Sequence, residues 1–335
     1  MTERGKIDRT FFDDVVYPNL GAERDDVALG PHHGVDFGVL DVGGRAVVTA
    51  TDPVSILPDL GWERAARFAL GVVLADVAVS SIPPSHLAIS FSLPPEMSDE
   101  AFATVWTTMA DDLEDLGTSV LAGHTARYAG CTFPWVGGAT VLGVGDHADV
   151  VRPDGARPGD HLLVTHGPAV EATALFAALF PDAIDLPDDL LARQAERLPG
   201  TEHVRDALVA GAAGPVTAMH DATECGLRGA LVELARGAGV RLDVDSTATP
   251  VSDEAAAICD ALDMDPWAAT TSGSLLVTVR PDGVEAVVEA LERRGTPVAD
   301  AGLVREGEGV YVDGERVRHP EEDPAWRVWE TLSGA

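Results

Sequence analysis

The sequence predicts an α/β protein made of two domains, and three observations support this prediction. The chain has 335 residues, a length typical of about two domains. Strand-like and helix-like runs alternate through its second half, as in layered α/β domains. A turn-rich segment, residues 143–160, separates two regions of regular hydrophobic periodicity. We therefore expect one domain at 1–150 and a second at 151–335.

The first domain is expected to begin with a β-hairpin and a buried helix. Strand-like runs at 37–40 and 46–51 flank the turn signal Asp41-Val42-Gly43-Gly44. Residues 62–80 are apolar on nearly every side, as in a buried helix, and Pro83-Pro84 ends that run. The other expected elements are a strand at 86–93, a helix at 99–116 with Ser98 as its N-cap and Gly117 after its end, and a strand at 119–122.

The second domain is expected to alternate strands with helices. The expected strands are 161–165, 216–220, 240–244, 274–279 and 298–304. The expected helices are 170–180, 227–236, 252–262 and 283–294. A final hairpin is expected across Asp313-Gly314.

The composition predicts a strongly acidic surface. Lys and Arg number 23 against 55 Asp and Glu, which gives a formal net charge of −32. Such a charge disfavours nucleic acid and anionic membranes as partners, because both repel an acidic protein. It is typical of proteins that work in a salt-rich cytosol, and we therefore expect a halophilic protein. Hydrophobic residues make up 46% of the chain, which is ample for packed cores.

The sequence also predicts a cytoplasmic protein without membrane segments. The polar residues 1–6 are followed by no apolar signal region, and no stretch approaches about 18 uncharged apolar residues. The cysteines Cys131, Cys225 and Cys259 form neither a CxxC pair nor an even-numbered disulfide framework. We expect them to be free thiols.

Four aspartates stand in strongly apolar surroundings. Asp52 follows the β-branched run 45–51, and Asp36, Asp76 and Asp221 are embedded in similar stretches. A buried carboxylate is costly unless it is paired, so such positions favour a functional role. Mg²⁺ is commonly bound by a few carboxylates together with substrate phosphates, and the four acids therefore suggest a magnesium and phosphate site. The alternatives are a solvated surface acid, a turn acid at Asp36 or a helix cap at Asp221.

A glycine-containing segment is a second candidate for phosphate binding. Gly123-His124-Thr125 follows a predicted strand, where glycine lets the backbone approach a ligand and the two side chains offer donors. The alternative is a strand-ending turn with a satisfied histidine. Neither GxxxxGK[ST] nor a strand-anchored GxGxxG occurs, which disfavours Walker-type and Rossmann nucleotide sites.

Seven short segments resemble motifs of the aminoimidazole-ribonucleotide (AIR) synthase superfamily, and they occur in that superfamily's order. The resemblance spans about residues 34–280. The segments are GVDFGVL at 34–40, VTATDP at 48–53, LADVA at 74–78, AGHT at 122–125, GARPGD at 155–160, HDAT at 220–223 and TSGSLL at 271–276.

The resemblance implies both a fold and a chemistry. The superfamily contains AIR synthase, the hydrogenase-maturation protein HypE, thiamine-monophosphate kinase and selenophosphate synthetase. These proteins use ATP and Mg²⁺ to phosphorylate an oxygen or comparable atom of a small substrate. The implied fold is PurM-like: the N-terminal sheets pair into a barrel across a dimer, ATP binds near that interface, and a C-terminal α/β domain closes over it.

Carried over residue by residue, the resemblance implies two sets of site residues. The set that would hold the Mg²⁺–phosphate assembly is Asp36, Asp52, Asp76 and Asp221. The set that would line it is Gly123, His124 and Thr125. The chain departs from the superfamily pattern at His124, where aspartate is usual, and at Ala75, where asparagine is usual. These departures bear on the metal count and the phosphate geometry.

Within the superfamily, the pattern looks most like the archaeal AIR-synthase-related, HypE-like proteins. Hydrogenase maturation itself is not expected, because the sequence ends without the cysteine that carries a carbamoyl group in HypE. Selenophosphate synthetase is disfavoured because no cysteine stands in an N-terminal glycine-rich loop. We expect an ATP- and Mg²⁺-dependent enzyme that phosphorylates an oxygen of a small amide, carboxylate or phosphate substrate. The alternatives are a thiamine-monophosphate-kinase-like enzyme, a nucleotide-binding assembly or regulatory protein of the same fold (hydrogenase-maturation-like) that has lost turnover, and a carboxylate-rich structural protein with no ligand.

A homodimer is also expected. Residues 46–51 and 86–93 are apolar on both faces, in the manner of strands that are buried on both sides. A small N-terminal sheet has few elements of its own to cover such strands. A second subunit would supply the cover.

Overall fold

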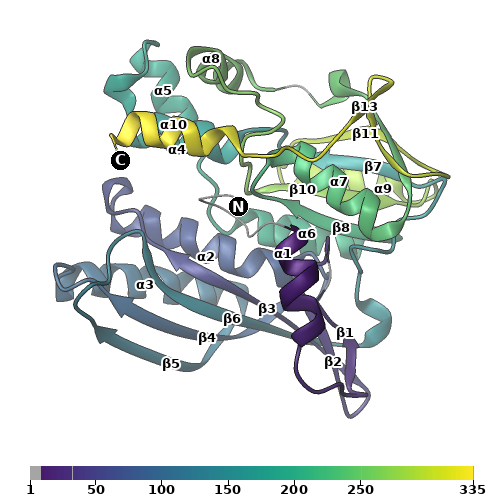
Figure 1. The fold of residues 1–335 in the computed structure, drawn as a ribbon, viewed down its shortest axis with the longest axis horizontal. Helices are drawn as coiled ribbons and strands as arrows, with labels where there is room; N and C mark the ends of the chain where they lie inside the picture. Colours follow the sequence, from purple (N-terminus) through teal and green to yellow (C-terminus); the bar gives the residue numbers. More distant parts are fainter. Residues whose placement is uncertain (1–8, 32, 250, 335) are drawn as a thin grey trace.

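The computed structural model describes residues 9–31, 33–249 and 251–334, which form two layered units stacked on one another (Figure 1). Each unit is built around one mixed sheet with helices packed on it. In the described part of the chain, one sheet has six strands and the other has seven. The prediction of an α/β fold with two layered parts is therefore confirmed.

The first sheet is mostly antiparallel. Its strands are β1 (Val27–Leu29), β2 (Gly38–Val42), β3 (Arg45–Ser55), β4 (Pro84–Leu93), β5 (Ser119–Arg127) and β6 (Trp135–Gly145). They lie in the order β1-β2-β3-β6-β4-β5. β2 and β3 form the predicted hairpin, with Val42 opposite Arg45. β4 and β5 run parallel. β5 is the last strand in this order and therefore an edge strand.

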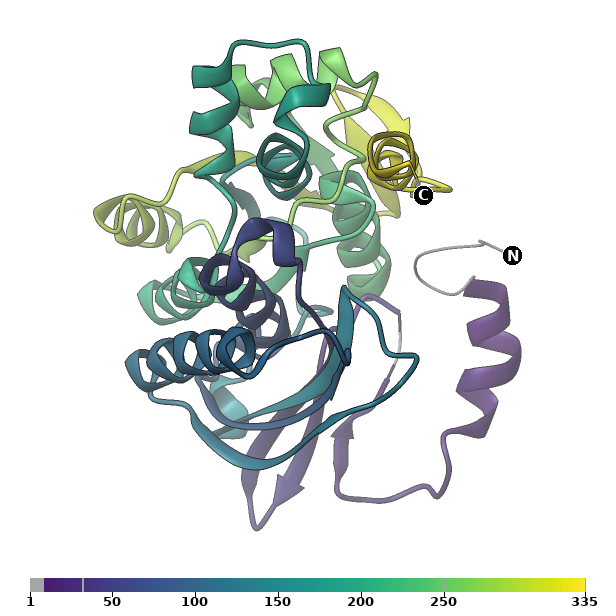
Figure 2. The same ribbon diagram turned by 90° about the vertical axis from the view of Figure 1, so that its left-hand side faces the viewer.

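Two long helices cover one face of the first sheet (Figure 2). They are α2 (Trp62–Ala78) and α3 (Asp99–Leu116). α2 is buried along most of its length, because it is apolar on several sides, as its sequence predicts. Ser98 caps α3 as predicted, since its side chain accepts a hydrogen bond from the Ala101 N–H. Gly117 adopts the left-handed conformation after the last turn.

The opposite face of the first sheet is open in a single chain. Burial alternates along β3, where Ala46, Val48 and Ala50 are buried under the helices and Thr51 is exposed. The edge strand β5 is exposed along almost its whole length. The strands of the first sheet carry apolar residues on both faces, but helices cover only one of these faces.

The second sheet has helices on both faces. Its strands lie in the order β13-β12-β9-β11-β7-β10-β8. They are β7 (His161–Thr165), β8 (Val216–Ala222), β9 (Arg241–Val244), β10 (Ser274–Val279), β11 (Val298–Arg305), β12 (Gly309–Val312) and β13 (Glu315–Val317). α7 (Gly226–Ala238) covers one face, while α6 (Glu202–Ala213) and α9 (Val284–Arg293) cover the other. β10 is buried throughout: Leu275 and Val277 join the core on the α6 side, and Leu276 joins the core on the α7 side.

Four further helices gather beside the second sheet, at the upper left of Figure 1. They are α4 (Val170–Leu179), α5 (Asp188–Ala195), α8 (Asp253–Ala261) and α10 (Pro324–Ser333). Phe176 of α4, Ile258 of α8 and Val328 of α10 share one small hydrophobic core. The short α1 (Arg9–Phe11) and the helical turns that follow it lie outside this cluster (Figure 1).

The two units are joined by close packing of α2 against α6. A Cβ atom at Gly71 would collide with the carbonyl oxygen of Gly200, so only glycine permits this approach. His203 of α6 adds a hydrogen bond between its Nε2 and the Gly71 carbonyl oxygen, at 3.2 Å. One hydrophobic core consequently continues from α2 into α6 and β10.

Several elements differ from the sequence expectations. No strand was expected at residues 135–145, yet β6 lies inside the first sheet, where a Cβ at Gly137 would collide with the Ser90 carbonyl oxygen of β4. β3 continues through Pro53 to Ser55, because β2 no longer pairs with it beyond Thr49 and leaves one side without ladder hydrogen bonds. Asp52 therefore lies inside a strand and not at its end. α5, α6 and α10 were not expected.

Two predicted absences can be compared with the structure. Within the described ranges, no helix is both long enough and apolar enough to cross a membrane. None of the three cysteines forms a disulfide, as expected from their number and spacing.

Candidate functional site

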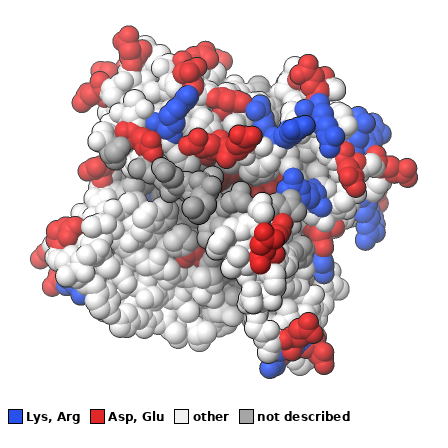
Figure 3. Space-filling view, in the orientation of Figure 1, with Lys and Arg blue, Asp and Glu red and all other residues white. Residues whose placement is uncertain are grey.

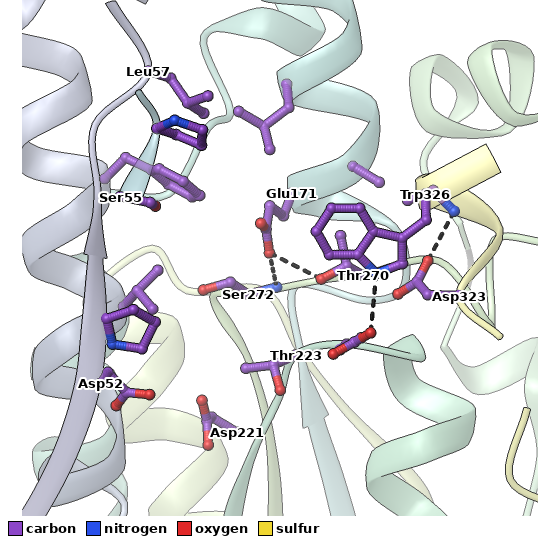
Figure 4. Close-up of a pocket in the computed structure, with 18 of the residues that line it drawn as sticks. Asp52, Ser55, Leu57, Glu171, Asp221, Thr223, Thr270, Ser272, Asp323 and Trp326 are labelled. Carbon is purple, nitrogen blue, oxygen red and sulfur yellow. Dashed lines mark hydrogen bonds between the residues drawn. The ribbon is translucent and has the colours of Figure 1, made fainter. Parts of the chain in front are cut away.

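A cavity of about 940 Å³ lies between the two units. β3 and α2 line it from the first unit, and α4, β8 and α10 line it from the second. Figure 4 shows Asp52 and Asp221 close to one another, whereas Glu171, Asp323 and Trp326 lie farther along. We call the part near Asp52 the carboxylate end, formed by Asp36, Asp52, Asp76 and Asp221. We call the other part the aromatic end, formed by Glu171, Phe176, Thr270, Ser272, Asp323, Trp326 and Trp329.

The carboxylate end brings together the four aspartates that the sequence singled out. Asp52 comes from β3 and Asp76 from α2, whereas Asp221 comes from β8 and Asp36 from the segment before β2. Carboxylates that are distant in sequence meet because the two units close on each other. This juxtaposition depends on the packing between the units and not on any one motif.

Asp76 shows how strongly these charges interact. Burial raises the pKa of Asp76 well above its ordinary value, and the neighbouring carboxylates Asp221, Asp52 and Asp36 raise it further. A side-chain contact with Asp52 raises the pKa of Asp76 further. Like charges this close cannot all ionise without a compensating cation.

Asp36 and Asp221 meet next to His220. Ligand atoms of these three residues all lie within 4.8 Å of one another, a spacing that suits a shared metal ion. Asp221 is almost fully buried, with 5% of its surface exposed. It lies in β8 opposite Leu275, so its backbone is fixed by the ladder of the second sheet.

His220 is better explained as a counter-charge than as a metal ligand. Its Nδ1 lies 2.6 Å from Asp36 Oδ2 and its Nε2 lies 3.2 Å from Glu233 Oε2. Burial would lower the pKa of His220, but Asp36 and Glu233 outweigh burial and raise it well above the ordinary value. A doubly hydrogen-bonded imidazolium has no lone pair for a metal. His220 therefore orients Asp36 and offsets part of the negative charge.

The donor set of the carboxylate end fits a hard divalent cation. Carboxylate oxygens from several elements, together with phosphate oxygens and water, are the usual environment of Mg²⁺. Burial first, and the neighbouring carboxylates second, raise the pKa of Asp76, and a divalent cation would offset both costs of ionising it. The residues present are therefore suited to such an ion.

The aromatic end is organised around Glu171 in the first turn of α4. Glu171 Oε2 accepts hydrogen bonds from the Ser272 N–H at 2.9 Å and from Thr270 Oγ1 at 3.3 Å (Figure 4). Burial raises the pKa of Glu171 to about 7. Both partners belong to the loop that leads into β10, so the carboxyl group is held against a rigid strand.

α10 closes the aromatic end and is tied to the loop after β8. Asp323 caps α10 through the Ala325 N–H at 2.8 Å, and its other oxygen accepts from the Cys225 N–H at 2.7 Å. Burial raises the pKa of Asp323 to about 6. Trp326 Nε1 donates to Glu224 Oε1 at 2.9 Å, which orients the indole beside the cavity.

The predicted segment Gly123-His124-Thr125 lies elsewhere. It belongs to the exposed edge strand β5, which continues to Arg127, and none of its residues lines the cavity of a single chain. His124 Nε2 lies 3.0 Å from the Tyr128 hydroxyl, on the same strand. The alternative interpretation of this segment as a strand-ending turn is wrong, because the residues are paired with β4.

Some of the cavity residues were missed by sequence reasoning. Glu171 follows Gly167-Pro168, a pair that by itself predicts only a turn, and Trp326 lies in a helix that was not expected. His220 was noted only as part of a motif. The sequence pattern that could have indicated Glu171 is an acid in the first turn of an otherwise apolar helix. A helix that is apolar all round is buried, so an acid within it is expected to lie at least partly in the interior.

Sequence comparison places these features in a family. Models of the AIR synthase related protein family match the chain in two parts: the N-terminal domain model matches residues 34–150 and the C-terminal domain model matches 157–315. A putative hydrogenase expression/formation protein of Methanocaldococcus jannaschii is 23% identical over 293 residues, which cover 86% of this chain and 84% of that protein. Carbamoyl dehydratase HypE of Rhizobium leguminosarum bv. viciae is 28% identical over 314 residues, covering 87% and 81%.

Structural comparison agrees. The hydrogenase maturation protein HypE, solved in complex with ATP, matches with a TM-score of 0.70 at 19% identity, over 96% of this chain and 97% of that chain. The two-domain PurM-like fold predicted from the seven motifs is confirmed by this match and by the two family models. The chain therefore belongs to the AIR synthase-related protein family.

Proposed function

We propose that this protein uses ATP and Mg²⁺ to phosphorylate an oxygen atom of a small substrate inside the cavity between its two units. The observation that carries this proposal is the convergence of Asp36, Asp52, Asp76 and Asp221 at one end of that cavity. The membership of the family and the likeness to a HypE solved with ATP support it.

In the proposed reaction, the carboxylate end would bind the triphosphate together with Mg²⁺. No Lys, Arg or His stands among the described residues that line the cavity, so those residues offer phosphates no cationic side chain. Bound Mg²⁺ would supply that charge by neutralising phosphate oxygens. The side chains of Asp36, Asp52, Asp76 and Asp221 would hold the ion, and His220 would keep Asp36 in place through its 2.6 Å contact.

The protein's own contribution is positioning. The substrate oxygen attacks the γ-phosphorus, the bond from that phosphorus to the bridging oxygen breaks, and ADP leaves with the electron pair. Phosphoryl transfer of this kind needs alignment and charge neutralisation more than covalent help from the protein. A cavity enclosed by α2, α4 and α10 provides such alignment and limits access of water.

The test is the affinity for ATP in the presence and absence of Mg²⁺, measured by calorimetry in potassium chloride buffer. Asp52→Asn removes one charge without changing shape, and we expect it to weaken Mg²⁺-dependent ATP binding by about 2 kcal/mol, the scale for losing a charged hydrogen-bonding partner. Asp149→Asn, an exposed aspartate of the same unit, is the matched control and should bind as the wild type does. Equal affinity in wild type and Asp52→Asn would remove Asp52 from the site.

Turnover separates an enzyme from a binding protein of the same fold. We expect ADP to form when candidate acceptors are added to the wild-type protein with ATP and Mg²⁺. Tight ATP binding with no ADP formation across a broad acceptor panel would favour a nucleotide-binding assembly or regulatory protein instead.

We further propose a homodimer that forms through the open face of the first sheet. Figure 3 shows a broad surface almost free of charged side chains at lower left, where Figure 1 shows β4, β5 and β6. This is unexpected for a chain with a net charge of −32. The exposed apolar side chains there include Val120 (42%), Leu121 (63%), Trp135 (56%) and Val144 (44%). Such a patch is typical of a protein interface.

The dimer would give the β5 residues a role. Trp135 belongs both to the exposed patch and to the cavity wall, so a second copy on this face would border the cavity. Gly123, His124 and Thr125 of that copy would then be available to the nucleotide. Mixing Asp52→Asn chains with His124→Ala chains tests this arrangement: a shared site should recover ATP binding in part of the mixed dimers, whereas separate sites should recover none beyond the sum of the two variants.

A further inference from the structure

The two ends of the cavity call for different ligands. The carboxylate end has the donor set for a metal and its phosphates. The aromatic end is separated from it along the cavity and is walled by side chains from α4 and α10 (Figure 4). Under the proposed function, this second end is where the part of the acceptor that does not react would lie.

The charge of the cavity wall restricts what that part can be. Among the described residues that line the cavity, seven are acids and none is Lys, Arg or His. The acids are Asp36, Asp52, Asp76, Glu171, Asp221, Glu224 and Asp323. A metal at the carboxylate end would offset the charge of that end only. An anionic group placed at the aromatic end would face Glu171 and Asp323 without a compensating cation, which is costly in a partly buried site.

Glu171 is placed to receive a hydrogen-bond donor. Its two hydrogen bonds within the protein both end on Oε2, from Ser272 and Thr270. Its Oε1 accepts no hydrogen bond from the described residues, and the side chain lines the cavity. The backbone on both sides is fixed, since Glu171 opens α4 and Ser272 precedes β10.

The remaining wall is aromatic and apolar. Trp326 and Trp329 of α10 and Phe176 of α4 line this end. Trp329 packs edge-on against Phe180, with ring centroids 5.5 Å apart, and Phe180 also contacts Phe176. The faces of indole and phenyl rings attract cations, and their bodies exclude water from an apolar ligand.

We infer that the aromatic end binds a small organic cation, an amine-bearing acceptor whose protonated nitrogen pairs with Glu171 while its apolar part packs against the aromatic side chains of α4 and α10. This inference rests on the proposed function for the identity of the reaction, but the binding site itself depends only on the residues of the aromatic end. An acceptor that presents a carboxylate or a phosphate at this end is disfavoured by the same acidic wall.

The pKa of Glu171 agrees with this assignment. Burial raises it to about 7, so the ionised carboxylate is destabilised when the cavity holds no cation. An ammonium group would favour the ionised form and draw the pKa back down, and this gain contributes to binding.

Three probes of the same shape test the inference. Phenethylamine, phenethyl alcohol and phenylacetate share a ring and a two-carbon arm or its equivalent, and differ in charge. Binding of each is measured by calorimetry to the full chain with Mg²⁺ and ADP present. We expect the amine to bind roughly tenfold more tightly than the alcohol, from a charge-assisted contact and cation–π attraction. We expect no binding of the carboxylate.

Two variants and one control assign the effect to Glu171. Glu171→Gln should abolish the preference for the amine over the alcohol, and Glu171→Asp, which keeps the charge, should retain part of it. Glu308→Gln, an exposed acid in the turn between β11 and β12, should behave as the wild type. Affinity for ATP and Mg²⁺ should be unchanged in all three variants.

Four outcomes would overturn the inference. The first is tighter binding of phenylacetate than of the amine, and the second is a preference for the amine that survives in Glu171→Gln. The third is a loss of ATP affinity in Glu171→Gln. The fourth is no binding of the amine at millimolar concentration by protein that does bind ATP. The third would assign Glu171 to the nucleotide. Failure of the wild-type protein to bind ATP at all would contradict the proposed function instead, while amine binding at Glu171 could still be measured without nucleotide.

Discussion

The two sheets of this protein differ in how their faces are covered. The second sheet carries α7 on one face and α6 and α9 on the other, and every residue of β10 is buried. The first sheet carries α2 and α3 on one face only, and β5 is exposed almost throughout. A sheet covered on both sides is complete within one chain. The first sheet has an open face that is largely apolar, almost free of charged side chains and adjacent to the cavity, so it is the face through which we propose that a second copy binds.

The largest effect expected from this difference is on stability. Leu275→Ala in β10 should lower the free energy of unfolding by about 2–5 kcal/mol, because the side chain is fully buried between α6 and the sheet. The matched change Leu121→Ala in β5 should cost less than about 0.5 kcal/mol in a dissociated chain, since Leu121 is exposed. Urea unfolding at low protein concentration measures both, and equal losses would contradict the comparison.

A smaller loss of stability is expected when a buried carboxylate of the second unit, Asp206, is neutralised. Asp206 of α6 accepts hydrogen bonds from His166 Nε2 (3.2 Å), Arg294 Nε (2.8 Å) and Thr296 Oγ1 (2.7 Å). Asp206→Asn should lower the free energy of unfolding by about 1–3 kcal/mol at neutral pH. Asp149→Asn should change it little.

The effect of Asp206 should depend on pH with a defined sign. Burial alone would raise the pKa of Asp206, but the hydrogen bonds from His166, Arg294 and Thr296 outweigh burial and lower it. A lowered folded-state pKa means that the stabilisation is complete above the unfolded pKa of about 4 and is lost as the pH falls through the folded pKa. Unfolding measured from pH 7 down to acid should show the gap between wild type and Asp206→Asn shrinking only in acid. A gap that widens in acid would show that the sign is wrong.

The open face is tested by a charge at its centre. Leu121→Glu should raise the dissociation constant of the proposed dimer by at least roughly tenfold, because the interface would then bury an unpaired carboxylate. Light scattering across a range of protein concentrations measures this change. The control is Leu20→Glu. Leu20 is also an exposed leucine but lies outside the sheet, so this change should leave assembly unchanged. A wild-type monomer at micromolar concentration in high salt would remove the proposal altogether.

The smallest expected effect is that of salt on the whole molecule. With a net charge of −32 the chain repels itself at low ionic strength, where the Debye length is about 30 Å at 0.01 M, and much less at 1 M, where it is about 3 Å. Molar potassium chloride should therefore raise the melting temperature by several degrees and favour dimerisation. A melting temperature that stays the same or falls would contradict the halophilic interpretation and would point to a basic partner for the acidic surface.

The sequence by itself determined the local elements with strong periodicity or clear caps. The hairpin of β2 and β3 was predicted because two β-branched runs flank a glycine turn, and α3 because Ser98 and Gly117 mark its ends. β7 and β10 were predicted with their observed bounds, since short apolar runs bounded by turns have few other solutions. These features are set by neighbouring residues, which a sequence displays directly.

The sequence also singled out the four aspartates, because an acid within an apolar run is costly wherever the chain places it. It did not indicate that Asp52 lies inside a strand, since the extension of β3 depends on β6, a strand that was not expected. Glu171, His220 and Trp326 were missed as cavity residues for the same reason: each gains its environment from an element distant in the chain.

Only the tertiary structure decided which of the candidate residues meet. Asp36 and Asp76 belong to the first unit and Asp221 to the second, and their mutual repulsion arises from the packing of α2 against α6 and β8. One of the seven motif segments contains Gly123, His124 and Thr125, just as others contain the aspartates. These three residues nevertheless lie on an edge strand outside the cavity of one chain. The physical reason is that a motif specifies local backbone and chemistry, whereas distances between motifs are set by long-range burial of apolar surface, which depends on the whole chain and, at the open sheet, on what covers it.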